Sequence, residues 1–128
     1  MKTLKHTFII LFTLLSLSCV QERHSKTITF KVDMRQIETV NNVGIRGNFT
    51  EDSWNETIPM LDNNGDGIYE TTITRETAFN AMQFKFVNQE SDFELKDADN
   101  RILEFEYKPE VITYEAKFNS PESIITKQ

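Results

Sequence analysis

Hydrophobic and polar residues alternate along most of this chain, and the alternation predicts its strands. Residues 27–34 place four hydrophobic side chains on one face and polar side chains on the other, as expected of a half-buried strand. The densest repeat is at residues 81–87, where Met82, Phe84 and Phe86 share a face and each contributes roughly 1.5 to 3 kcal/mol of transfer free energy when buried. We therefore expect a central core strand here, with Lys85 on the opposite face, toward solvent or a ligand.

Weaker runs predict the remaining strands, at residues 42–48, 56–61, 68–74, 93–95, 102–107 and 110–118. Residues 75–80 are the one place where a helical turn is conceivable, and they contain no amphipathic repeat. About seven to eight short antiparallel strands separated by turn residues predict an all-β fold, an immunoglobulin-like β-sandwich. Residues 119–128 are expected to form a flexible tail.

A run of turn-forming residues occupies positions 62–67 and predicts a hairpin with Met60 on one side and Tyr69 on the other. The same run matches the first half of a calcium-binding loop, in which Asp62, Asn64 and Asp66 would supply oxygens. The twelfth position of such a loop needs a glutamate, and here it is Ile73. A plain turn is favoured, and a weak cation site at these three residues is the alternative.

The N-terminal segment predicts export. Residues 1–18 combine two lysines with an apolar run of about ten residues, which is typical of a signal peptide and too short to span a bilayer. The only cysteine, Cys19, follows Ser18 as in the lipobox of bacterial lipoproteins, which this segment resembles. The resemblance implies lipidation of Cys19, residues 19–26 as anchor and tether, and a cell-envelope location. An ordinary signal peptide with an incidental cysteine is the alternative.

Composition limits the mature chain to one small domain, at residues 27–118. Without residues 1–18 it has 12 basic and 20 acidic residues, a formal charge near −8, which argues against nucleic acid as a partner. After the leader the only histidine is His24, and no Gly-x-Ser-x-Gly motif is present, so common catalytic arrangements lack their parts. We expect no enzyme activity, no cofactor and no histidine-based metal site.

The single tryptophan is the most informative residue for function. Residues 43–47 predict a short strand that runs into a polar loop containing Trp54. An indole on a polar loop offers a flat apolar face and one N–H donor, which suits stacking on a sugar ring. The alternative is that Trp54 folds back and caps the core.

Five segments in order resemble the starch-binding and glycogen-binding modules, which are immunoglobulin-like sandwiches attached to amylases and glycogen-sensing kinases. The segments are Thr27-Ile-Thr-Phe-Lys-Val, Val43-Gly-Ile-Arg-Gly-Asn-Phe with Trp54 after it, Gly67-Ile-Tyr-Glu, Gln83-Phe-Lys-Phe-Val, and Phe93-Glu94 with Asp99-Asn100-Arg101. The similarity covers residues 27–118, nearly the whole mature domain. It departs from the family at Phe93, where the family has a second tryptophan, and in the spacing between Glu94 and Asn100.

The resemblance implies a carbohydrate site. Trp54 and Phe93 would stack on neighbouring glucose units, and Lys85, Glu94 and Asn100 would bond hydroxyl groups. Phe93 as a core residue, Asn100 as a turn residue and Lys85 as a solvated lysine remain the alternatives.

The expected function is non-catalytic binding of an α-glucan such as starch, glycogen or a maltooligosaccharide, on a membrane-tethered module. An envelope enzyme that processes glycans is a further candidate partner. The competing interpretation is a protein-interaction or structural domain of the cell envelope that has lost its sugar site.

Overall fold

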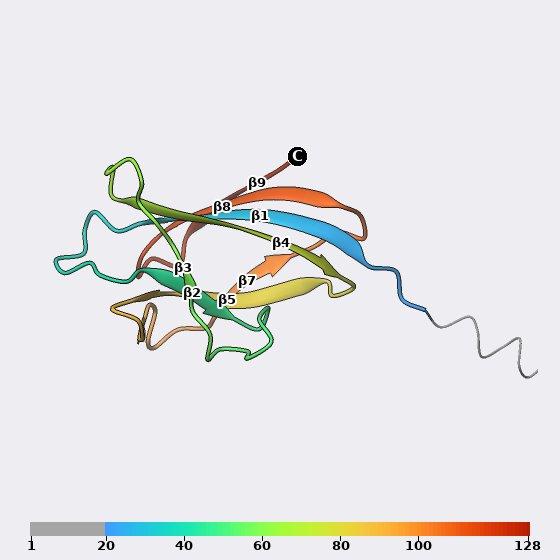
Figure 1. The fold of residues 1–128 in the computed structure, drawn as a ribbon, viewed down its shortest axis with the longest axis horizontal. Coiled ribbons are helices and arrows are strands. Elements are labelled where there is room, and N and C mark those ends of the chain that lie inside the picture. The colour runs from blue at the N-terminus through green and yellow to red at the C-terminus, as the bar shows by residue number, and fades with distance from the viewer. Residues whose placement is uncertain (1–19) are drawn as a thin grey trace, which may run out of the picture.

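The computed structural model describes residues 20–128, which form an all-β fold of nine strands (Figure 1). The strands are β1 (His24–Asp33), β2 (Gly44–Gly47), β3 (Ile58–Pro59), β4 (Ile68–Thr77), β5 (Ala81–Asn88), β6 (Asp92–Phe93), β7 (Arg101–Glu104), β8 (Glu110–Lys117) and β9 (Ser123–Lys127). A search of these residues for a helix long and apolar enough to cross a membrane finds none. The predicted signal peptide and Cys19 lie outside the described residues.

Two sheets face each other, as the alternation predicted (Figure 1). The first sheet has the order β4-β1-β8-β9, and the second has β3-β2-β5, with β6 and β7 both pairing with β5. The structure differs from the expectation of seven to eight antiparallel strands in two ways: it has nine strands, and β1 runs parallel to β8.

The core between the sheets is built from the alternate positions of β1, β5 and β8. The ring of Phe84 lies 5.0 Å from those of both Phe30 and Tyr114, in edge-to-face geometry that favours aromatic pairs. At the alternating hydrophobic positions of residues 27–34, 81–87 and 110–118, the buried side chains are Ile28, Phe30, Val32, Met34, Met82, Phe84, Phe86, Ile112, Tyr114 and Phe118.

Both predicted boundaries of the domain, at residues 27 and 118, are wrong. Residues 24–26 were expected in the tether, but they belong to β1, where His24 pairs with Thr77. Residues 123–127 were expected in a flexible tail, but they form β9 along the edge of β8. The sequence of β9 hides the strand because all five residues are exposed and show no alternation. Lys127 helps to hold the strand in place, since its Nζ lies 3.0 Å from a carboxylate oxygen of Glu110.

The predicted hairpin around residues 62–67 is also wrong. β3 pairs with β2 of the second sheet, whereas β4 pairs with β1 of the first, so the chain crosses between sheets here. A single bridge between Leu61 and Glu70 is all that remains of the expected pairing.

The turn itself uses its polar side chains locally. The Gly67 N–H donates to Asp62 (2.9 Å), and the Ile68 N–H donates to Asp66 (2.9 Å). Asn64 accepts a hydrogen bond from the Asp66 N–H. Across residues 20–128, no group of three His, Cys, Asp or Glu residues could hold a metal ion. The oxygens of Asp62, Asn64 and Asp66 thus accept hydrogen bonds from N–H groups of the turn, and the weak cation site at these residues stays a prediction.

Candidate functional site

The loop that holds Trp54 begins where β2 ends at Gly47. A side chain at that position would meet the carbonyl oxygen of Gln83 at 2.3 Å, so only glycine fits beside β5. The backbone N–H of Trp54 donates to the backbone carbonyl of Gly47 (2.9 Å), which closes the loop back on the strand. Trp54 has a φ of 68°, a left-handed conformation that costs a bulky residue about 1 to 3 kcal/mol and tends to occur at functional sites.

Trp54 and Phe93 lie side by side, with ring centroids 6.5 Å apart and planes inclined by 45°. Phe93 pairs with Val87, which alternates with the core residue Phe86, so Phe93 lies on the outer face of the second sheet. Both rings are half-buried. The indole is therefore neither fully exposed nor part of the core between the sheets.

Arg46 completes an aromatic cluster, which we define as Trp54, Phe93 and Arg46. Its guanidinium carbon lies 5.5 Å from the centre of the Phe93 ring, a cation–π distance. Its Nε donates to Thr57 (2.6 Å) and its Nη2 to the Glu90 carbonyl (3.0 Å), and these bonds fix the side chain. A depression of about 320 Å³ lies beside Arg46, lined also by Asn42 and Pro59.

The prediction that Lys85 points to solvent or a ligand is wrong. Lys85 does face away from the core, but it is only 8% exposed. Its Nζ donates to the carbonyls of Leu95 (2.7 Å) and Ala98 (3.0 Å), so the loop after β6 covers it. Lys85 therefore positions that loop.

Glu94 is fully buried, which excludes direct contact with a ligand in this conformation. Residues 95–100 form a loop that leaves the second sheet between β6 and β7. Where the loop leaves a gap beside β5, the backbone N–H of Phe86 donates to Glu94 Oε1 (3.0 Å). Arg101 forms two bonds with the same carboxylate, of 2.6 and 2.9 Å. Burial disfavours the charge on Arg101, but Glu94 more than offsets this and keeps the pKa of Arg101 above its usual value.

Arg101 also ties the two sheets together. Its Nη2 donates to the carbonyls of Lys117, the last residue of β8, and of Ser120, in the turn between β8 and β9. The Asn119 N–H of that turn donates to Glu94. Glu94 and Arg101 thus form a structural pair rather than a ligand-binding one.

Asn100 remains accessible. It is exposed, and its side-chain amide donates to Gln83 (3.2 Å), an exposed residue on the outer face of β5. Sequence reasoning missed Arg46 and Gln83 as site residues. The sequence signal for Arg46 was its place after the inward Ile45, which puts it on the outer face; the structure adds that it lies directly opposite Lys85.

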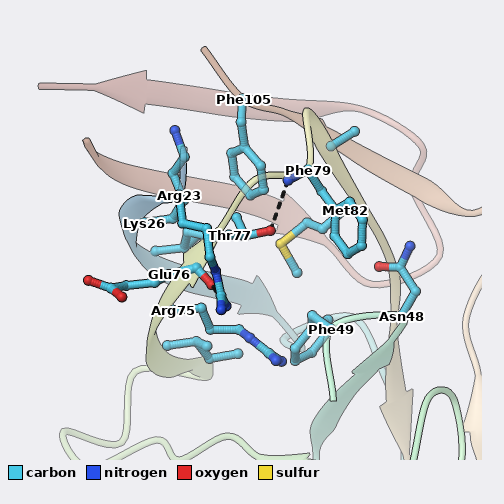
Figure 2. Close-up of a pocket in the computed structure, with 13 residues that line it drawn as sticks. Arg23, Lys26, Asn48, Phe49, Arg75, Glu76, Thr77, Phe79, Met82 and Phe105 are labelled. Atoms are coloured by element: carbon cyan, nitrogen blue, oxygen red, sulfur yellow. Dashed lines mark hydrogen bonds between the residues drawn. The ribbon is translucent and has the colours of Figure 1, made fainter. Parts of the chain in front are cut away.

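A separate pocket of about 120 Å³ lies between the sheets, at the end where β1 begins (Figure 2). Its walls are mainly apolar, with Phe49, Met82 and Phe105 among them, and Arg23 and Arg75 also line it. It shares no residue with the aromatic cluster.

Comparisons with known proteins identify the fold. No family model and no curated protein matches the chain. Among solved structures, it is similar to the modules CBM25-2 and CBM25-1 of the β/α-amylase from Paenibacillus polymyxa. The first match has 15% identity and a TM-score of 0.50, covering 82% of this chain and 94% of the module. The second has 17% identity and a TM-score of 0.50, covering 81% and 93%.

These identities are low, so the likeness establishes the shared fold. The chain has the β-sandwich architecture of carbohydrate-binding modules. The fold implied by the sequence resemblance is thereby confirmed.

Proposed function

We propose that this domain is a non-catalytic module that binds an α-glucan at Trp54 and Phe93. The observation that carries the proposal is the pairing of the two half-buried rings on an outer sheet face, 6.5 Å apart. The strained backbone of Trp54 supports it, because an unfavourable conformation persists only where the surroundings enforce it. The fold shared with two modules of an amylase is consistent with it.

The inclination of the rings suits a curved polymer. The two ring planes are inclined by 45°, and we propose that this inclination would match the curvature of an α-glucan better than two coplanar rings. Polar contacts would come from the guanidinium of Arg46 and from the amides of Asn100 and Gln83. Asn100 keeps the hydroxyl-binding role expected of it, and we propose Arg46 and Gln83 in place of Lys85 and Glu94, which are buried.

The affinity of such a site is expected to be weak. Two stacking faces and a few hydroxyl contacts support a Kd on the order of 10 μM to 1 mM, or roughly −4 to −7 kcal/mol. Weak sites become effective when the module is held near its ligand. We propose that lipidation of Cys19, after removal of residues 1–18, holds the domain at the cell envelope, beside an enzyme that processes glycans.

Affinity electrophoresis in gels containing amylose or glycogen tests the glucan proposal. We expect the wild-type domain to be retarded, and Trp54→Ala to weaken binding about tenfold because it removes one stacking face. Phe79→Ala is the matched control, since it removes an exposed aromatic ring outside the cluster and should leave retardation unchanged. Equal migration of wild type and Trp54→Ala would refute the site and favour a protein-interaction role.

A further inference from the structure

One end of the sandwich has exposed aromatic side chains that the core does not use. We call it the entry end, and it consists of residues 20–23, the β4–β5 turn at 78–80 and the β7–β8 turn at 105–109 (Figure 1). Phe79 is 78% exposed and Tyr107 is 65% exposed. Both are at one end of the molecule, in turns that neighbour each other.

The three segments are held together as one surface. His24 pairs with Thr77, and its ring lies 4.5 Å from that of Tyr107. The Phe105 N–H donates to the Asn80 carbonyl (2.7 Å), joining the two turns. Phe79 and Tyr107 therefore project from the same end of the molecule.

The structure also shortens the tether. Because residues 24–26 belong to β1, only residues 20–23 separate Cys19 from the first paired residue, His24. The five extended steps from Cys19 to His24 reach at most about 18 Å. A lipid on Cys19 would therefore keep the entry end within about 18 Å of the membrane surface.

We propose that the entry end docks on a phospholipid surface, with Phe79 and Tyr107 at the level of the headgroups. The proposal rests on the lipid anchor proposed at Cys19. Tyrosine favours the membrane–water interface because it combines an apolar ring with a polar hydroxyl, and phenylalanine inserts its apolar ring at the boundary between headgroups and acyl chains. The domain would then stand on this end, and the aromatic cluster, on an outer sheet face, would point sideways along the membrane.

The charges of the entry end fit lipid phosphates. Within residues 20–128, neither Arg23 nor Arg75 has a carboxylate at ion-pair distance, and both line the pocket shown in Figure 2. Guanidinium groups bind phosphate oxygens well. Glu76 and the Glu106–Lys108 pair (3.1 Å) keep the net charge of the surface low. Docking should therefore not require anionic lipids.

The opposite end differs in composition. Its turns at residues 62–67 and 88–92 consist mostly of Asn, Gln, Asp and Glu and contain no aromatic residue, and the turn at 34–43 contains no aromatic residue either. Leu61, next to the turn at 62–67, is 60% exposed and provides a matched position for comparison.

Tryptophan fluorescence on vesicles tests the orientation. The chain from Cys19 to Gln128 is coupled through its single thiol to a maleimide lipid in phosphatidylcholine vesicles. Phe79→Trp and Leu61→Trp are each made in a Trp54→Phe background, so that each variant has one indole. Brominated phosphatidylcholine then reports contact with the bilayer.

We expect the indole of Phe79→Trp to shift to shorter wavelength and lose about half its emission, and that of Leu61→Trp to be unaffected. Equal, negligible quenching of both variants would overturn the proposal, and so would stronger quenching of Leu61→Trp. Urea unfolding of both variants in solution confirms that each is folded.

Separate measurements distinguish this proposal from those on which it rests. Chemical coupling bypasses natural lipidation, and glucan binding is measured on the uncoupled domain. Incorporation of labelled fatty acid into wild type but not Cys19→Ser supports the anchor that docking in the cell requires, and its absence from wild type would overturn docking in the cell.

Discussion

Lys31 and Lys85 occupy equivalent places in the two sheets but have opposite surroundings. Each lies in a long strand between two buried hydrophobic residues and faces away from the core. The side chain of Lys31 is 34% exposed and pairs with Glu70 across the outer face of the first sheet (3.0 Å). Lys85 is buried and bonds two loop carbonyls.

The difference comes from what covers each face. The outer face of the first sheet displays cross-strand pairs such as Thr29–Thr72 (3.0 Å), while the second sheet has the loop of residues 95–100 and the aromatic cluster on its outer side. Alternation reports which side of a strand faces the core, but not whether the other side faces water. The glucan site that we propose lies on the outer face of the second sheet, which is the covered one.

The largest effect on stability should come from substituting Arg101, which anchors the loop that covers the outer face of the second sheet. Arg101→Met would leave the Glu94 carboxylate buried without its cation, and we expect a loss of about 3 to 5 kcal/mol in the free energy of unfolding. Urea denaturation measures it. Glu70→Gln, which removes the partner of Lys31, is the control and should cost about 0 to 1 kcal/mol. Similar losses in both variants would show that the two faces do not differ as described.

A smaller effect is expected at the lysines themselves. Lys85→Met removes two charge-assisted hydrogen bonds to the loop and should destabilise the domain by about 1.5 to 3 kcal/mol. Lys31→Met should change stability by less than about 0.5 kcal/mol, as is usual on a surface. Hydrogen exchange should also show faster exchange at residues 95–100 in Lys85→Met alone. Unchanged exchange there would contradict the positioning role of Lys85.

The smallest effect concerns Asp33, on the same outer face as Lys31. Hydrogen bonds from Arg35 lower the pKa of Asp33 to about 2 from 3.8. The depressed pKa stabilises the fold above pH 4, and this contribution is lost as the pH falls from about 4 to 2. Because the Arg35 guanidinium is mostly exposed, we expect about 1 kcal/mol.

Asp33→Asn tests this titration. The variant should be less stable than wild type at pH 5, and the difference should vanish near pH 2. A constant difference across this range, measured by urea unfolding, would show that titration of Asp33 contributes nothing.

The core of the fold could be predicted from sequence because alternation determines which side chains are buried. Phe30, Phe84 and Tyr114 needed no information beyond their spacing. β9 could not be found this way, since its exposed residues lack a period and its position depends on the edge of β8. The crossing at Leu61 was equally hidden, because a turn sequence does not say which strand will pair with its flanks.

The candidate site was predictable only in part, for a related reason. Trp54 was conspicuous as the single tryptophan on a polar loop, and the structure places it beside Phe93. Glu94 was expected to bond sugar hydroxyl groups, but it is buried against Arg101, which lies seven residues further along the chain, beyond the loop of residues 95–100. Sequence alone does not show that the loop brings the two together inside the domain.

The pairing of β1 has a mechanical consequence. β1 is bonded along ten residues to β4 on one side and along eight residues to β8 on the other. A force applied at the N-terminus acts along the strand, so it loads both ladders in shear and many hydrogen bonds must break together. Forced unfolding depends on the height of that barrier rather than on equilibrium stability. The strand to which the force is applied, β1, is thus the one with the most extensive pairing to its neighbours.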